Sequence, residues 1–172
     1  MSGPFRLELL GASHLRAGFD CGVGALNAYL QTQASQDARR RMSACYVALA
    51  AADPVAVAGY YSLAAASVPL ADLPEPLAKR LPRYPAVPVA RLGRLAIDLR
   101  CQGQGLGAVL LADAALGAAR SEVAVMGLVV DAENDAAEAF YRHHGFVHFG
   151  ANPRQLVVAL NIFQQPSLGS PQ

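Results

Sequence analysis

Residues 100–107 read Arg-Cys-Gln-Gly-Gln-Gly-Leu-Gly, and they carry the main indication of the fold that the chain is expected to adopt. It follows an apolar run that ends at residue 99, and it leads into the alanine- and leucine-rich residues 105–120. The order predicts a strand, a glycine-rich turn and a helix. Glycine lets a backbone turn tightly and approach a ligand closely. The N–H groups and the dipole at the start of a helix favour an anion there.

The alternating glycines do not match the two commonest phosphate-binding loops. Gly103, Gly105 and Gly107 are each separated by one residue. The dinucleotide fingerprint has two residues between its second and third glycines, and a Walker A loop ends in Gly-Lys followed by Ser or Thr. A pyrophosphate cradle of another kind and a turn without a ligand both remain open at this point.

Residues 134–146 form a second motif, which reads Asn-Asp-Ala-Ala-Glu-Ala-Phe-Tyr-Arg-His-His-Gly-Phe. Asn134 is predicted to cap a helix, and Gly145 to end it in the left-handed conformation. Tyr141 lies near the end of this helix, where tyrosines usually serve packing. Its alternative role is that of a proton donor, because a phenol is protonated at neutral pH.

Together the two motifs resemble the GNAT superfamily of acetyl-CoA-dependent N-acetyltransferases. In that family an Arg/Gln-x-x-Gly-x-Gly/Ala segment, here residues 100–105, binds the pyrophosphate of coenzyme A, and the pattern of residues 134–146 also matches. The resemblance implies an α+β fold, an α/β sandwich with about four helices flanking a central mixed, mostly antiparallel twisted sheet of about six to seven strands. The implied cofactor-binding residues are Leu95, Ala96, Ile97, Arg100, Gln102, Gly103, Gln104, Gly105, Leu106, Gly107, Asn134 and Phe140.

A narrower resemblance covers most of the chain. Residues 19–30, 59–63 and 88–98, in that order, look like the GNAT toxins of bacterial toxin–antitoxin pairs, the TacT/AtaT type. This implies a homodimeric enzyme that acetylates the amino group of aminoacyl-tRNA, and a small ribbon-helix-helix antitoxin as its partner. Relatives without toxicity look alike, so two further interpretations stay open. One is an acetyltransferase of a small amine or a protein, and the other is a non-enzymatic binding or repression component.

Tyr141 is the predicted catalytic residue. A free α-amine has a pKa of about 7.7–8.0, so much of it is neutral without a strong general base. The harder step is expulsion of coenzyme A, in which Tyr141 is expected to protonate the departing thiolate. Backbone N–H groups around residues 95–97 are expected to hold the pantetheine arm and polarise the carbonyl. His143 and His144 are expected to be exposed at the helix end.

The charge along the chain is uneven, although the formal net charge is only +1. Residues 39–100 hold nine basic and four acidic side chains, whereas residues 101–172 hold three and six. A solvated helix end with scattered surface arginines is enough to explain the positive charge of residues 39–100. If the substrate is an RNA, however, these residues could bind its phosphates, since Lys and Arg are the usual phosphate ligands. The residues predicted to contact tRNA are Arg39, Arg40, Lys79, Arg80, Arg83, Arg91 and Arg94.

The length of 172 residues suits one domain, expected at residues 1–163 and followed by a flexible tail at residues 164–172. No apolar run approaches the ~20 residues that span a bilayer. The N-terminus lacks the basic region and apolar core of a secretory signal. These features predict a cytoplasmic protein without membrane contact. The three cysteines form no CxxC pair, so neither a metal site nor a disulfide framework is expected.

Hydrophobic periodicity and turn residues predict alternating strands and helices. The expected strands are residues 5–10, 45–51, 55–68, 87–99, 123–130, 146–149 and 156–162, and the expected helices are 22–42, 105–120 and 135–144. An Asp-Pro turn at residues 53 and 54 is expected to join the second and third strands. The proline-rich residues 74–88 are expected to form a loop with at most one short helix at residues 77–81.

Overall fold

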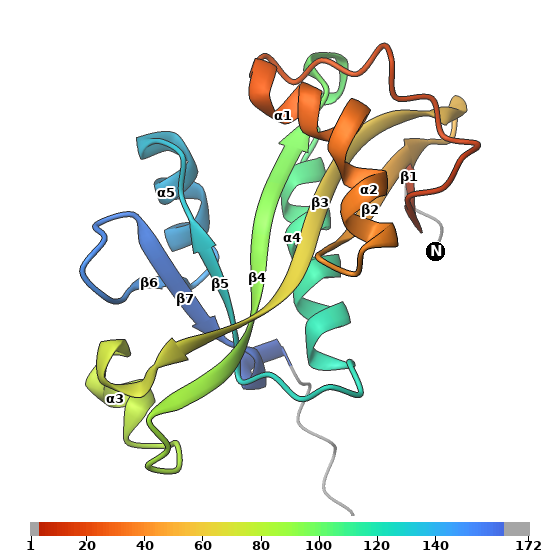
Figure 1. Ribbon diagram of the computed structural model, residues 1–172. Helices are drawn as coiled ribbons and strands as arrows, with labels where there is room; N and C mark the ends of the chain where they lie inside the picture. Colours follow the sequence, from red (N-terminus) through yellow and green to blue (C-terminus); the bar gives the residue numbers. More distant parts are fainter. Residues whose placement is uncertain (1–3, 164–172) are drawn as a thin grey trace, which may run out of the picture. The chain divides into compact units, whose positions relative to one another are not determined.

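The computed structural model describes residues 4–163 of the chain. By contacts the chain divides into two compact units (Figure 1). The first unit holds the residues up to Ala64 together with Leu92–Ala114, and the second holds Ala65–Arg91 and the residues from Ala115 onward. Strands β3 (Asp53–Pro69) and β4 (Ala86–Ile97) and helix α4 (Leu106–Ala119) each contribute residues to both units.

In the first unit, β1 (Phe5–Leu9), β2 (Ala44–Ala50) and β3 form an antiparallel series. Between β1 and β2 the chain makes one helical run, composed of α1 (Gly24–Ala28), a π-helical segment (Tyr29–Gln33) and α2 (Ala34–Arg39). The run is shorter than the helix predicted at residues 22–42. Gly22 has a φ of 89° and Arg41 a φ of 58°, and neither angle fits a right-handed helix.

Two neighbouring tyrosines of β3 show how the strands of the first unit lie between helices. Successive side chains of a strand point to opposite faces of its sheet. Tyr60 donates from its hydroxyl to the carbonyl oxygen of Leu26 in α1, over 2.6 Å. Tyr61 donates from its hydroxyl to the carboxylate of Asp113 in α4. The first helical run therefore covers one face of these strands and α4 covers the other (Figure 1).

The hairpin between β2 and β3 is confirmed, but its turn lies earlier than predicted. Ala50 pairs with Asp53, so Ala51 and Ala52 form the turn. Asp53 and Pro54 are the first residues of β3. Proline is tolerated there because the first residues of a strand need not donate to the ladder.

The second unit contains the ends of β3 and β4, and three further strands. β7 (Gln155–Ala159) pairs antiparallel with both β5 (Gly127–Asp131) and β6 (Val147–His148), and α5 (Asp135–His143) lies between β5 and β6 in sequence. Buried apolar side chains from β4, β5 and β7, together with the segment after β3, form the core of this unit. Short helical turns occur at Leu70–Asp72, Leu99–Cys101 and Leu160–Phe163, the second of them in the first unit.

Several element boundaries in the second unit differ from the predictions. The strand expected at residues 156–162 is β7 and ends at Ala159, where a helical turn follows. The helix expected at residues 77–81 is α3 (Glu75–Ala78), because Pro76 is compatible with a first helical turn, in which an N–H group is not needed. The strand expected at residues 123–130 begins only at Gly127. Before it, the N–H of Val123 bonds to the Ser121 hydroxyl over 3.2 Å, a local contact typical of a turn.

Across the residues that the structure describes, seven strands form one sheet in the order β1-β2-β3-β4-β5-β7-β6. If the first helical run is counted as one helix, the described residues contain four helices, the other three being α3, α4 and α5. The predicted fold class is therefore confirmed. No helix among these residues is long and apolar enough to span a membrane. The predicted tail at residues 164–172 lies outside the described residues.

Candidate active site

The glycine-rich turn between β4 and α4 requires glycine at two positions. Gly103 and Gly105 have φ angles of 79° and 78°, in the left-handed region that L side chains avoid. A Cβ added to either residue would meet no atom within 4 Å. The conformation of the turn, and not crowding by the protein, therefore selects glycine, and the space beside the backbone is open to a ligand.

The start of α4 supplies N–H groups next to this turn. The N–H of Val109 bonds to the carbonyl oxygen of Gly105 over 3.3 Å. The helix itself thus provides no acceptor for the N–H groups of Leu106, Gly107 and Ala108. Open glycine backbone in front of a helix start fits an anion such as a pyrophosphate. Of the two interpretations of this motif, the arrangement favours the cradle.

A buried carboxylate lies at the centre of the hydrogen bonds below the turn. Asp98 is 2% exposed. Its Oδ1 accepts from the N–H and from Nε of Arg100, each at 2.9 Å, and its Oδ2 accepts from Nη2 of Arg100 at 3.3 Å and from the N–H of Asp20 at 3.1 Å. Burial acts to raise the pKa of Asp98, but these hydrogen bonds outweigh it and hold the pKa below its ordinary value.

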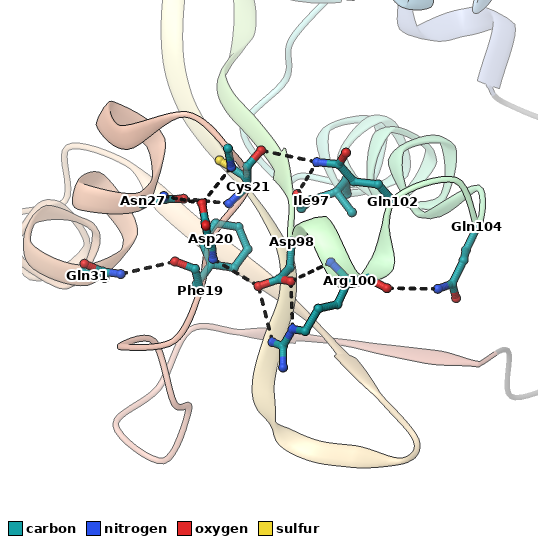
Figure 2. A network of polar contacts seen from close by, with 11 residues as sticks. Phe19, Asp20, Cys21, Asn27, Gln31, Ile97, Asp98, Arg100, Gln102 and Gln104 are labelled. Carbon is teal, nitrogen blue, oxygen red and sulfur yellow. Dashed lines mark hydrogen bonds and ion pairs between the residues drawn. The ribbon is translucent and has the colours of Figure 1, made fainter.

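The same network continues into the segment before α1 (Figure 2). The other carboxylate, Asp20, accepts from the N–H of Gly22 at 2.9 Å and from Nδ2 of Asn27 at 3.0 Å. Gln102 donates from Nε2 to the carbonyl oxygens of Cys21 at 3.3 Å and Ile97 at 3.0 Å. The N-terminal segment is therefore attached directly to the glycine-rich turn.

These contacts change the roles predicted for three side chains. Arg100 is paired with Asp98, and Gln102 is bonded to two backbone carbonyls. Gln104 donates to the carbonyl oxygen of Arg100 at 3.5 Å, at the long limit of a hydrogen bond. Their part in cofactor binding remains a prediction. The geometry makes backbone N–H groups, and not these side chains, the ready partners of an anion.

The predicted pantetheine-binding strand, residues 95–97, is packed closely against β3. A Cβ on Gly59 would lie 3.1 Å from the carbonyl oxygen of Ala96 and 3.1 Å from Cδ1 of Ile97. Glycine at this position permits the close approach. The N–H of Asp98 bonds to the carbonyl oxygen of Ala58 at 2.9 Å. The role of Leu95, Ala96 and Ile97 towards a cofactor stays a prediction.

In the second unit, α5 presents the predicted catalytic tyrosine. Tyr141 is 8% exposed, and its ring centroid lies 5.3 Å from those of both Phe140 and Phe146. Burial, with a smaller contribution from the Glu133 carboxylate, raises the pKa of Tyr141 to about 12. The phenol is thus fully protonated at neutral pH, as a proton donor must be.

The ends of α5 follow the sequence prediction. Oδ1 of Asn134 accepts from the N–H of Ala137 at 2.8 Å, which confirms the N-cap, whereas its contact with a cofactor remains a prediction. Gly145 ends the helix with a φ of 94°. His143 is exposed as expected, but His144 is half-buried, with its ring centroid 4.8 Å from that of Phe140.

The basic residues predicted to contact tRNA have different environments. Arg91 donates to the Asp131 carboxylate at 2.8 Å. The guanidinium carbon of Arg94 lies 3.5 Å from the centroid of the Tyr29 ring. All of the others are exposed, and no ion pair is recorded for them within residues 4–163; they are Arg39, Arg40, Lys79, Arg80 and Arg83.

Sequence reasoning missed Asp98, Asp20 and Asn27 as parts of this site. A signal for Asp98 did exist, because a carboxylate ends an otherwise apolar strand directly before the glycine-rich turn. Such a residue, once buried, needs several donors. Nothing in the sequence indicated that one of those donors would be the backbone 78 residues away.

Three comparisons bear on the family. The tRNA-acetylating toxin of Mycobacterium tuberculosis is 34% identical over 145 residues, which are 83% of this chain and 84% of that protein. A structure of AtaT complexed with acetyl-methionyl-tRNAfMet has a TM-score of 0.84 and 34% identity, over 92% of this chain and 96% of that one. A tyrosine-to-phenylalanine mutant of KacT has a TM-score of 0.84 and 30% identity, over 93% and 97%.

The family model agrees with both motifs and with the fold. A model described as an acetyltransferase (GNAT) domain matches residues 41–148. This range includes the glycine-rich turn, α4, β5 and the whole of α5. The chain therefore belongs to the GNAT acetyltransferase family.

Proposed function

We propose that this protein is an acetyl-CoA-dependent N-acetyltransferase whose substrate is the amino group of aminoacyl-tRNA, and that it acts as a toxin by blocking translation. The turn at Gly103 and Gly105 is the observation that carries the cofactor part, because its open backbone precedes the N–H groups of α4. A related AtaTR structure is bound with AcCoA, which supports the same assignment.

The substrate part rests on relatives and on charge. The relatives include a tRNA-acetylating toxin and an AtaT structure that contains acetyl-methionyl-tRNAfMet. Exposed cations at Lys79, Arg80 and Arg83 suit a partner with many phosphates. A small-amine substrate would make no use of these charges.

Acetyl-CoA, when bound, supplies a thioester whose carbonyl is attacked by the amine. Backbone N–H groups at the start of α4 would hold its pyrophosphate. Tyr141 would supply a neutral hydroxyl for the sulfur that departs. A thiol has a pKa of about 8.5, whereas the Tyr141 phenol has a pKa of about 12. Complete proton transfer from the phenol to the departing thiolate is therefore thermodynamically unfavourable. We therefore assign to Tyr141 a hydrogen bond that strengthens as negative charge develops on the sulfur.

For partners, we propose an antitoxin and a second copy of this chain. AtaT has been solved with the C-terminus of its antitoxin AtaR, and an AtaT–AtaR complex has been solved with DNA. These relatives support an antitoxin here, for which we expect a ribbon-helix-helix type. Aminoacyl-tRNA is consumed in the cytoplasm, where we place the activity.

Translation in a cell-free extract tests the proposal. With the protein and acetyl-CoA present, translation should stop, and mass analysis should find an acetyl group on the aminoacyl moiety of tRNA. Omission of acetyl-CoA should restore translation. Continued translation with unmodified aminoacyl-tRNA, in the presence of measurable acetyl-CoA binding, would favour a small-amine acetyltransferase. No acetyl-CoA binding would contradict both enzymatic interpretations.

A further inference from the structure

Arg94 lies over an aromatic ring in the first unit. Its guanidinium carbon lies 3.5 Å from the centroid of Tyr29, within the range of a cation–π contact. Along β4, residues 94 and 96 share one face, since side chains alternate, and Asp98 follows directly after the strand. Ala96 and Asp98 also meet the N-terminal segment, through Phe19 and Asp20.

The Tyr29 ring is held by hydrogen bonds at its hydroxyl and by stacking on a second tyrosine. The hydroxyl of Tyr29 donates to the Asp37 carboxylate at 2.8 Å and lies 3.0 Å from the Ser43 hydroxyl. Burial is the largest of the causes that raise the pKa of Tyr29, so the hydroxyl stays neutral and keeps these contacts. The ring also stacks on Tyr60, with centroids 6.3 Å apart and planes inclined by 18°.

The charge of Arg94 is not compensated by a carboxylate in its own unit. In the first unit, Arg6 forms an ion pair with Glu8, and Arg100 forms one with Asp98. Among the described residues of this unit, the Arg94 guanidinium has neither an ion pair nor a hydrogen bond. The nearby Asp37 instead accepts from Tyr29. A planar guanidinium that lies over an aromatic ring and has no carboxylate partner among the described residues of its unit is suited to bidentate binding of a phosphate.

A second arginine adds positive charge to the same part of the unit. Arg16 donates from Nη1 to the Ser35 hydroxyl at 2.6 Å and likewise has no recorded carboxylate partner among the described residues of the first unit. Burial raises the pKa of the Cys45 thiol to about 12, and the charges of Arg16 and Arg94 both act to lower it. Both cations therefore act on one buried group, which indicates that their fields overlap.

From this geometry we propose that Arg94, which lies over the ring of Tyr29, binds a phosphate of the RNA substrate and so helps to position that substrate. Tyr29, Asp37 and Ser43 are positioning residues that keep the guanidinium plane in place. This inference rests on the proposed function for the identity of the substrate. It separates Arg94 from Arg91, whose guanidinium is already engaged by Asp131.

Steady-state kinetics of Arg94→Ala and Arg94→Lys provide the first test. Arg94→Ala should raise the KM for aminoacyl-tRNA by about 10- to 100-fold, the effect of removing one charged hydrogen bond, and leave the KM for acetyl-CoA within about twofold. Arg94→Lys keeps the charge but loses the planar fork, so it should recover only part of the affinity. Arg6→Ala, which removes an exposed arginine paired with Glu8, is the matched control and should change neither KM.

Binding of deacylated tRNA at several salt concentrations provides a test that does not require catalysis. The log–log salt slope should fall by about 0.7 to 0.9 in Arg94→Ala, as expected for one phosphate contact. Tyr29→Leu should weaken binding like Arg94→Ala, and the double variant should be no weaker than either, because the two side chains act as one element. Tyr29→Phe keeps the ring but loses the hydroxyl contacts with Asp37 and Ser43, so it should lose less of the binding than Tyr29→Leu.

The outcomes distinguish this inference from the proposed function. If the wild-type protein acetylates aminoacyl-tRNA but Arg94→Ala keeps both its KM and its salt slope, the inference is wrong and the function stands. If deacylated tRNA binds through Arg94 but no acetylation occurs, the function is wrong and the RNA contact stands. A rise in the KM for acetyl-CoA alone would assign the phosphate to the cofactor and overturn the inference.

Discussion

The carboxylate of Asp98 holds the guanidinium of Arg100, with Nε 2.9 Å from Oδ1 and Nη2 3.3 Å from Oδ2. The arginine that the family pattern assigns to the cofactor pyrophosphate is thus paired within the protein. Because Oδ2 also accepts from the backbone of Asp20, the pair connects the N-terminal segment to the glycine-rich turn. Asp98 therefore supports the turn from below, while the backbone of the turn stays free for an anion.

Replacing the buried carboxylate should destabilise the protein. Asp98→Asn keeps the shape of the side chain but weakens its bonds from two backbone N–H groups and a guanidinium, so the free energy of unfolding should fall by about 1–3 kcal/mol. Urea unfolding measures this change. Glu138→Gln is the control, because the Glu138–Arg142 pair is exposed and spaced four residues apart on a helix, and it should cost about 0.5 kcal/mol or less. Equal effects of the two substitutions would contradict the role given to Asp98.

The contribution of Asp98 should depend on pH in a defined direction. Its pKa in the folded protein lies below the ordinary value, so its stabilising effect is present above the unfolded pKa of about 3.9 and is lost as the pH falls through the folded pKa. The difference in unfolding free energy between wild type and Asp98→Asn should therefore be constant from about pH 5 to 7 and shrink below about pH 4. Urea titrations at several pH values measure it. A difference that grows on acidification would show that the pKa is raised.

Alanine at either glycine of the turn should impair cofactor binding. Gly103→Ala and Gly105→Ala place a Cβ on a left-handed backbone, at a cost of about 1–2 kcal/mol, and they point it into the open space assigned to the pyrophosphate. Calorimetry should show a weaker affinity for acetyl-CoA in both variants. Gly117→Ala in α4 is the matched control, because its Cβ also meets no atom within 4 Å and its φ is not positive. That variant should keep the affinity and stabilise the helix by up to about 1 kcal/mol. Unchanged affinity in both turn variants would remove the turn from the cofactor site.

Removal of the Tyr141 hydroxyl should slow the chemical step. Tyr141→Phe retains the ring, whose centroid lies 5.3 Å from those of Phe140 and Phe146, but should lower kcat by about 10²- to 10³-fold, the effect of removing one donor to a developing charge. The affinity for acetyl-CoA and the Tm should change little, because the hydroxyl acts on charge that develops only during reaction. With a pKa of about 12, the phenol should also cause no loss of kcat between pH 7 and about 10. Near-full turnover of the variant would mean that another donor, such as water or His143, interacts with the departing thiolate. Unfolding of the variant would mean that Tyr141 has a structural role.

Charge reversal in the proline-rich segment should affect the RNA substrate alone. Glutamate at Lys79, Arg80 and Arg83 together should raise the KM for aminoacyl-tRNA and lower the magnitude of its log–log salt slope by about 0.7 to 0.9 for each phosphate that is no longer bound. Acetyl-CoA affinity should stay the same. Arg120→Glu, at an exposed position just after α4, controls for net charge. A wild-type KM that does not respond to salt would favour a small-amine substrate.

The glycine-rich turn and the ends of α5 could be predicted because their conformations depend on neighbouring residues. A left-handed φ at Gly103, Gly105 and Gly145 requires glycine locally, and Asn134 caps the helix from a position next to it. The strands could be located because their hydrophobic pattern also depends on residues that are close together in sequence. Errors occurred where competing local contacts decide, as in the turn at Ala51 and Ala52 and the late start of β5 at Gly127.

Local sequence patterns were therefore sufficient to predict the order of the elements, the glycine-rich turn and the helix that presents Tyr141. The contact of Asp98 with Asp20, 78 residues away, and that of Arg94 with Tyr29 arise instead from tertiary packing. Both contacts depend on how the N-terminal segment packs against one face of β4. Residues far apart in sequence are brought together by burial of shared apolar side chains such as Phe19, Tyr60 and Ala96, and no local rule specifies which polar groups that burial leaves side by side.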